Sequence, residues 1–156
     1  GNIKLEFMNL NLNELVQQVN GEFAERFEGR NLDLICILQP EPLLIRADSR
    51  RIWRVLENLY VNVCKYAMPG TRVYVDAIKK DGKIQLSIKN ISENPLNFQA
   101  DELTERFIRG DVSRSTEGSG LGLSIAKNLT VLQHGSFNIY LDGDLFKVVI
   151  TLPETK

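Results

Sequence analysis

The sequence has few of the residues on which metal centres and catalytic triads depend. It contains one histidine, His134, two cysteines and one tryptophan. A single histidine excludes a multi-histidine zinc site and weakens the case for a Ser-His-Asp triad. Cys36 lies in an apolar run and Cys64 falls on the apolar side of a predicted helix. We therefore expect two reduced core thiols, as in a cytosolic protein, rather than a disulfide or a metal pair.

An excess of charge and long apolar runs are also absent. Lysine and arginine number 19 and the acidic residues 20, so the net charge is −1. Neither nucleic acid nor an anionic membrane surface is indicated as a partner. No apolar run reaches the roughly 20 residues of a membrane span, and the first residues do not resemble a signal peptide. At 156 residues and 43% hydrophobic content, we expect one domain over residues 1–156 with a substantial core.

The apolar patterns alternate between helical and strand periodicity. We expect helices, each with a capping asparagine or aspartate or a glycine at one end, at 11–29, 48–67 and 121–133. We expect strands at 3–10, 32–38, 43–46, 72–80, 83–90, 136–141 and 145–152. Asp81-Gly82 and Asp142-Gly143 are strong hairpin signals. Hairpins with interleaved helices predict an α+β fold, an α/β sandwich in which a mixed, largely antiparallel sheet has its helices on one face.

The predicted helix at 48–67 carries a polar row that a purely structural helix does not need. Asn58, Asn62 and Lys65 are spaced i, i+4 and i+7, opposite a broad apolar face. Arg51 and Arg54 begin the same row, so a solvated face is one interpretation. Asparagine, however, favours caps and turns over helix interiors. Two asparagines in mid-helix therefore indicate a partner outside the helix, and a ligand is one such partner.

Further along the chain, two segments add to this pattern. In the strand at 83–90, Asn90 shares the inward face with Ile84, Leu86 and Ile88 by period two. Residues 92–120 are polar and irregular, and a segment of this length is usually a functional lid or disordered.

A glycine-rich segment leads into the last predicted helix. Gly118, Gly120 and Gly122, with Leu121 between the last two, permit close approach of the backbone, and a helix start favours phosphate. Alone, the cluster fits a flexible hinge equally well. It is neither a P-loop nor a Rossmann fingerprint, because the lysine motif is missing and no strand precedes it.

The combination of these segments, in this order, resembles the ATP-binding domains of histidine kinases, relatives of gyrase and the Hsp90 chaperones. ENLYVNVCKYA is similar to the N box, FIRGDVSRS to the F box and GSGLGLSIAK to the G2 box. The resemblance covers roughly residues 47–153 and implies a Bergerat-type ATP-binding fold that uses ATP and Mg²⁺.

The resemblance also implies roles for individual residues. Asn62 would ligate Mg²⁺ through its amide oxygen, and Asn58 would lie beside the metal and the phosphates. Lys65 would reach the phosphates and Tyr66 would lie against the nucleotide, although a surface lysine and a packing aromatic are the plainer interpretations. Arg109, on the lid, would approach the terminal phosphate. Asn58, Lys65 and Arg109 would thus be the catalytic residues.

The sequence departs from the family pattern at two places. The usual Asp-x-Gly-x-Gly aligns with Asn90, Ser92 and Asn94, so the hydrogen bond to adenine should be weaker and adenine selectivity is open. ATP-hydrolysing relatives place a general-base glutamate where this chain has Asn58. An amide cannot take a proton from water, so transfer to histidine is favoured over hydrolysis.

No phosphoacceptor is evident, because His134 fits a turn residue at a helix end. The resemblance implies the catalytic half of a sensor protein, a cytoplasmic domain of a membrane-anchored kinase. Its partners would be a histidine-containing dimerisation domain and a response regulator receiver domain. Two alternatives remain: a degenerate, non-catalytic ATP-binding module that docks a partner protein, and a serine kinase of the anti-sigma-factor type. Lys65, Tyr66 and the long lid argue against the second.

Overall fold

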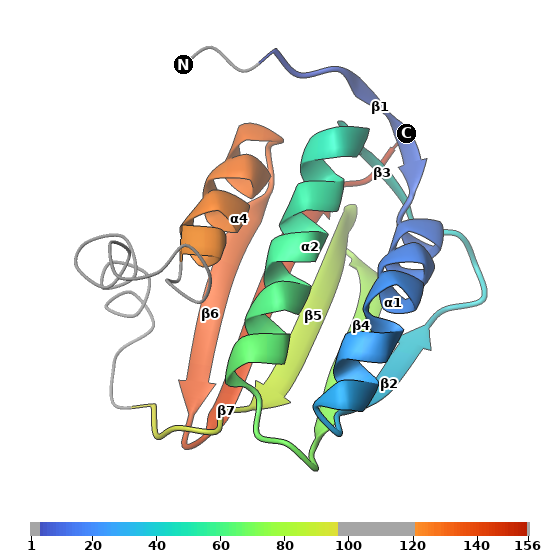
Figure 1. Ribbon diagram of the computed structural model, residues 1–156. Helices are drawn as coiled ribbons and strands as arrows, with labels where there is room; N and C mark the ends of the chain where they lie inside the picture. Colours follow the sequence, from blue (N-terminus) through green and yellow to red (C-terminus); the bar gives the residue numbers. More distant parts are fainter. Residues whose placement is uncertain (1–3, 97–120, 156) are drawn as a thin grey trace.

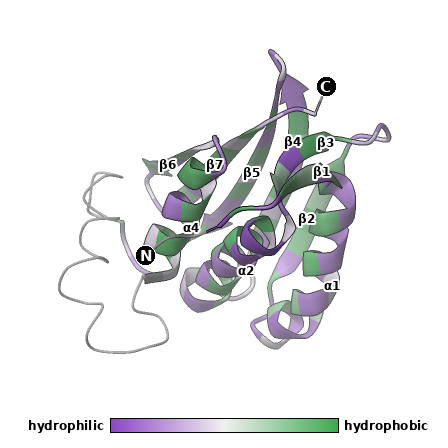
Figure 2. Ribbon diagram, turned by 90° about the horizontal axis from the view of Figure 1, so that it is seen from above, coloured by the Kyte–Doolittle hydropathy of each residue, from purple (hydrophilic) through white to green (hydrophobic). Residues whose placement is uncertain are grey.

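The computed structural model describes residues 4–96 and 121–155, which form a two-layer α/β sandwich (Figure 1). In chain order the elements are β1 (Phe7–Asn11), α1 (Leu12–Gly29), β2 (Asp33–Leu38), β3 (Leu44–Asp48), α2 (Ser49–Tyr66), β4 (Arg72–Lys80), β5 (Lys83–Ile91), α4 (Leu121–Leu132), β6 (Ser136–Asp142) and β7 (Leu145–Pro153). The described helices α1, α2 and α4 all lie on one face of the main sheet (Figure 2). None of the described helices is long and apolar enough to cross a membrane.

The main sheet has five strands in the order β2-β4-β5-β7-β6. β2 pairs with β4 in parallel, and the remaining neighbours are antiparallel. The predicted mixed, largely antiparallel sheet with helices on one face is confirmed. One detail differs, because the pattern predicted a single sheet. β1 and β3 instead form a separate two-stranded sheet, which an isolated bridge between Ile45 and Glu154 joins to the end of β7.

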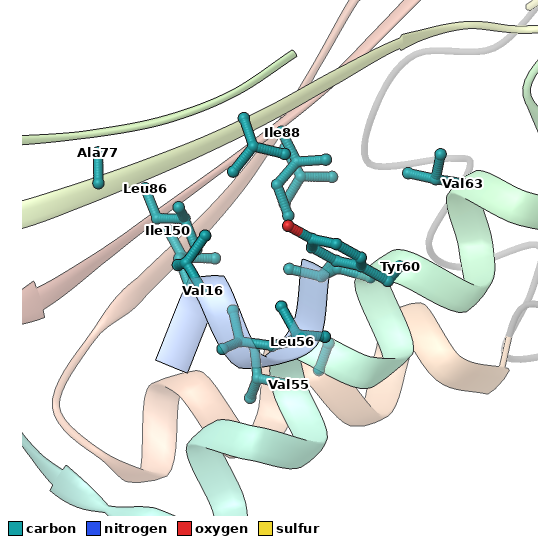
Figure 3. Close-up of a cluster of buried hydrophobic side chains, with 14 of the residues drawn as sticks. Val16, Val55, Leu56, Tyr60, Val63, Ala77, Leu86, Ile88 and Ile150 are labelled. Atoms are coloured by element: carbon teal, nitrogen blue, oxygen red, sulfur yellow. The ribbon is translucent and has the colours of Figure 1, made fainter. Parts of the chain in front are cut away.

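The core lies between α2 and the sheet, where alternate strand residues face the helices. Leu56 and Tyr60 of α2 pack with Leu86 and Ile88 of β5 and with Ile150 of β7 (Figure 3). Each of these side chains is almost fully buried, and burying an aliphatic side chain contributes about 1.5–3 kcal/mol. The apolar residues that recur with helical period in α2 therefore face those that alternate in β5, and their packing holds α2 over the middle of the sheet.

The start of α2 is held by hydrogen bonds from three parts of the chain. The Asp48 carboxylate caps the helix by accepting from the backbone N–H of Arg51 at 3.0 Å, and it accepts from Glu6 N–H at 2.8 Å. The backbone N–H of Asp48 donates to Gln133 Oε1 at 2.8 Å, at the end of α4. Burial opposes the charge, but the N–H donors and the charge of Arg51 outweigh it, so the pKa of Asp48 is lowered. Ionised Asp48 therefore stabilises the fold at neutral pH, and this contribution is lost as the pH falls through its lowered pKa.

Residues in the left-handed region follow two of the helices. Asn31 has φ +55° just after α1, and His134 has φ +67° just after α4. The His134 ring stacks on Phe7 of β1 with 5.4 Å between ring centroids. The prediction that His134 is a turn residue at a helix end is confirmed.

Candidate functional site

The C-terminal part of α2 and the end of β5 lie at the same end of the sandwich, and the start of α4 lies beside the middle of α2 (Figure 1). Backbone hydrogen bonds tie the first two together, from Met68 N–H to Ile91 O at 2.8 Å and from Glu93 N–H to Tyr66 O at 2.8 Å. These bonds fix the spacing between Asn62, one turn before the end of α2, and Asn90, one residue before the end of β5. Two asparagines that are 28 positions apart in the sequence thus belong to one rigid junction.

The predicted polar row of α2 is more buried than a solvated face would be. Asn62 is only 8% exposed. Asn58 is half-buried, and its side-chain Nδ2 is buried with no hydrogen-bond partner among the described residues. An unsatisfied buried amide costs about 1–3 kcal/mol. The row therefore has unused hydrogen-bonding capacity at this end of the fold.

Asn90 lies on the face of β5 that the helices cover, opposite Phe146 of β7. It is 2% exposed, and its Oδ1 accepts no hydrogen bond within 4–96 and 121–155. The prediction that Asn90 points inward is confirmed. A buried acceptor without a donor is well suited to a ligand that brings an N–H group.

Ser92 and Asn94 differ from Asn90, because local backbone already engages them. The Ser92 hydroxyl donates to Asn94 O at 2.7 Å, and the Ser92 N–H donates to Asp144 O at 2.7 Å. Asn94 itself is exposed. In the described structure both residues shape the turn after β5.

Lys65 and Tyr66 form the last turn of α2, and both are half-buried. A lysine at this position interacts favourably with the negative end of the helix dipole. The roles of Lys65 at the phosphates and of Tyr66 at the nucleotide stay predictions.

The first turn of α4 packs closely on the polar row. A Cβ placed on Gly122 would lie 3.6 Å from Asn58 Cβ, an ordinary van der Waals distance, so the first turn of α4 lies against α2 at Asn58. Leu121 is the first residue of α4. The other predicted residues, Arg109, Gly118 and Gly120, lie outside the described part of the chain, as does 97–120 of the predicted lid.

The side chains present fit a nucleotide with a hard cation. Asn62 offers a neutral amide oxygen, and Mg²⁺ usually takes few protein ligands and keeps water and phosphate oxygens. Asn58 supplies a buried amide donor one turn away, and Asn90 a buried acceptor on the facing strand. A phosphate-rich ligand with an exocyclic amino group would satisfy both kinds of atom.

The sequence over residues 47–156 matches the family model described as histidine kinase-, DNA gyrase B- and HSP90-like ATPase. The chain belongs to this family. ATP binding follows from membership, and the resemblance seen in the three sequence boxes is confirmed.

Similar proteins agree with this assignment. Over 123 residues the chain is 31% identical to the signal transduction histidine-protein kinase BaeS of Escherichia coli (strain K12), a match that covers 78% of this chain and 26% of BaeS. The structure of the catalytic domain of the histidine kinase ThkA has a TM-score of 0.82 and 27% identity, and the match covers 97% of both chains. A structure of ThkA in complex with the response regulator protein TrrA has a TM-score of 0.77 and 27% identity, and covers 97% of this chain and 42% of that one. The chain spans about a quarter to a third of the first curated relatives.

Sequence reasoning missed one residue beside the candidate site. Arg30, just after α1, donates from Nη2 to Ala67 O at 2.7 Å and lies 3.6 Å from the Glu93 carboxylate. It links α1 to both sides of the junction between α2 and β5. No local pattern marks such a residue, because its partners are 37 and 63 positions away in the sequence.

Proposed function

We propose that this chain is the ATP-binding catalytic domain of a two-component sensor kinase and that it transfers the γ-phosphoryl group of ATP to a histidine on a separate dimerisation domain. The observation that carries the proposal is the pair of buried, unsatisfied amide atoms of Asn58, one turn before Asn62 in α2, and of Asn90, near the end of β5. Membership of the ATPase family and similarity to sensor histidine kinases support it.

In this proposal the residues bind and orient rather than take part in proton transfer. Asn90 accepts a hydrogen bond from the adenine amino group, with Ser92 and Asn94 shaping the turn beside it. Asn62 holds Mg²⁺, which when bound neutralises charge on the phosphates. Asn58 and Lys65 position the phosphates, Tyr66 lies against the nucleotide, and Gly118, Gly120, Leu121 and Gly122 surround the phosphate chain. Arg109 approaches the γ-phosphate from a lid at about 92–120.

The proposed reaction needs no general base in this chain. The imidazole of the acceptor histidine uses its ring-nitrogen lone pair to form the new N–P bond, and the bond from the γ-phosphorus to the bridging oxygen breaks, which releases ADP. Asn58 occupies the position of a hydrolytic base and cannot accept a proton from water. Transfer to histidine is therefore favoured over hydrolysis.

The similar proteins also suggest the wider context. Because ThkA was solved with a response regulator protein, we infer that a receiver domain is the next acceptor. We also infer that the chain works as one domain, residues 1–156, on the cytoplasmic side of a membrane-anchored sensor.

The experiment that tests the function is a transfer assay. The chain is mixed with γ-labelled ATP, Mg²⁺ and a purified dimerisation domain of a similar sensor kinase, and label on the acceptor is measured after acid and after base treatment. Base-stable, acid-labile label is expected, as for phosphohistidine. Tight ATP binding without transfer to any supplied acceptor would instead favour the non-catalytic regulatory module.

Asn90→Asp is expected to tighten ATP binding several-fold, whereas Asn90→Ala should weaken it. The carboxylate keeps the acceptor geometry and adds charge, and charged and neutral hydrogen bonds differ by about 1 kcal/mol. The gain should be smaller for GTP, because its six-position carbonyl would face the carboxylate. Isothermal titration with ATP and GTP measures both effects.

The matched control for this prediction is Asn138→Asp. Asn138 is an exposed residue of β6, so this variant makes the same charge change away from the site. It should leave both affinities unchanged. If both Asn90 variants alter stability but keep the ratio of ATP to GTP affinity, Asn90 only ends the strand and the adenine assignment is wrong.

A further inference from the structure

The face of the main sheet that points away from the helices is not covered by any described element (Figure 2). Four residues on this face lie in direct register across four neighbouring strands: Tyr74 of β4, Lys89 of β5, Lys147 of β7 and Tyr140 of β6. We call these four residues the lysine–tyrosine row. Tyr140 is 53% exposed and Tyr74 is 37% exposed, and Lys89 and Lys147 are half-buried between them.

The two central residues of the row carry the same charge. Lys89 and Lys147 are directly opposite each other on antiparallel strands, an arrangement that destabilises a sheet. Each ammonium lies over a tyrosine ring, Lys89 Nζ 5.9 Å from the Tyr74 centroid and Lys147 Nζ 5.8 Å from that of Tyr140. The ion pairs found in the described ranges involve neither lysine. Lys89 and Lys147 are therefore two adjacent positive charges that form no ion pair with an acidic residue of the described ranges.

A hollow opens beside the row at the end of the sheet. It has a volume of about 210 Å³, and its lining residues are Arg72, Tyr74, Lys89, Asn90, Ile91 and Leu145. The surface of this hollow is mostly apolar, with Ile91 and Leu145 in its lining, and the basic side chains of Arg72 and Lys89 also border it. A carboxylate at the end of a short aliphatic stem matches this combination.

We propose that this sheet face is a docking surface for an acidic segment of a partner protein. One Asp or Glu side chain of the partner enters the hollow beside Arg72 and Lys89, and further carboxylates lie along Lys89 and Lys147. The charge of the surface selects such a partner, although the whole chain has a net charge of −1.

The same face argues for a protein rather than a lipid surface. By register, Asp33, Asp76 and Asp142 also belong to it. A flat anionic bilayer would bring its headgroups against these carboxylates as well as against the lysines. A folded partner can place its acidic side chains only where the cations are.

The docking surface lies directly behind the candidate nucleotide site. Lys89 and Ile91 flank Asn90 in β5, and their side chains point to the opposite face from that of Asn90. A docked partner would therefore contact the strand that carries the buried acceptor. The proposal does not rest on the kinase function, because it depends on the charges of the lysine–tyrosine row, which are present with or without ATP.

The test is a titration of the ¹⁵N-labelled chain with a glutamate oligopeptide, followed by amide chemical shifts at low and at high salt. We expect saturable shifts confined to the ends of β4, β5 and β7 around the row, which disappear at high salt. Lys147→Glu should weaken the binding about tenfold. The same substitution should raise the melting temperature, because it turns the like-charge pair with Lys89 into an opposite-charge pair.

The matched control is Lys80→Glu. Lys80 is exposed on the same sheet face, at the far end of β4 opposite Lys83, so the charge change is identical. If Lys80→Glu and Lys147→Glu weaken peptide binding equally, the peptide is held only by diffuse electrostatic attraction, and the proposal is wrong. Amide chemical-shift changes centred on the arginines of α2 would also overturn it. Binding to phosphatidylserine-containing vesicles that Lys147→Glu abolishes, without peptide binding, would assign the face to a membrane instead.

Discussion

Asn62→Ala is expected to lower phosphotransfer from Mg-ATP to an acceptor histidine by a factor of about 10²–10³, because a bound metal ion supplies several kcal/mol of charge stabilisation in the transition state. Asn62 is 8% exposed on the polar row of α2, so alanine removes a buried amide oxygen and with it the ligand that this residue offers to Mg²⁺. The measurement is the single-turnover rate of label transfer.

A second readout separates metal binding from catalysis. The affinity for ADP should depend strongly on Mg²⁺ in the parent and weakly in Asn62→Ala, whereas Asn62→Asp keeps an oxygen ligand and should lose less. Asn128→Ala, an exposed asparagine on α4, serves as the control and should behave as the parent. An Asn62→Ala protein that binds Mg-ATP as tightly as the parent would show that the metal assignment is wrong.

Gly135→Ala is expected to lower the free energy of unfolding by about 3 kcal/mol or more, at the upper end of the overpacking range. A Cβ on Gly135 would lie 2.3 Å from the carbonyl oxygen of Thr151 and 2.9 Å from Thr130 Cγ2. The Thr151 carbonyl cannot move away easily, because β7 is paired with β5 on one side and β6 on the other. Urea denaturation followed by circular dichroism measures the change.

Gly21 provides a control with the opposite sign. It lies inside α1, and no atom comes within 4 Å of a Cβ placed there. Gly21→Ala should therefore stabilise the protein by about 0.5–1 kcal/mol, because alanine loses less backbone entropy in a helix. Equal urea midpoints for Gly135→Ala and the parent would mean that the contact with Thr151 relaxes without cost.

Much of the architecture could be predicted because it depends on neighbours in the sequence. The hairpin turn at Asp81-Gly82 joins β4 and β5. Asp81 and Gly82 both have positive φ, as a two-residue turn of this kind requires. Asp48 caps α2 through its own side chain. Asn90 points inward because its position in β5 has the parity of the apolar residues before it. The three sequence boxes likewise lie within short segments, so the family could be assigned from them.

The remaining features depend on residues that are distant in the chain, and no local pattern contains them. The separate sheet of β1 and β3 needs pairing across α1 and β2, and the bond from Asp48 to Gln133 spans 85 positions. The close approach of Gly135 to Thr151 and the pairing of Lys89 with Lys147 exist only once β7 lies between β5 and β6. The sequence by itself therefore determined the elements, their order and the inward face of the site residues, since these follow from periodicity and turn chemistry. Only the tertiary structure decided which of the buried amides lack a partner and which charges meet, because both depend on burial and register between distant segments.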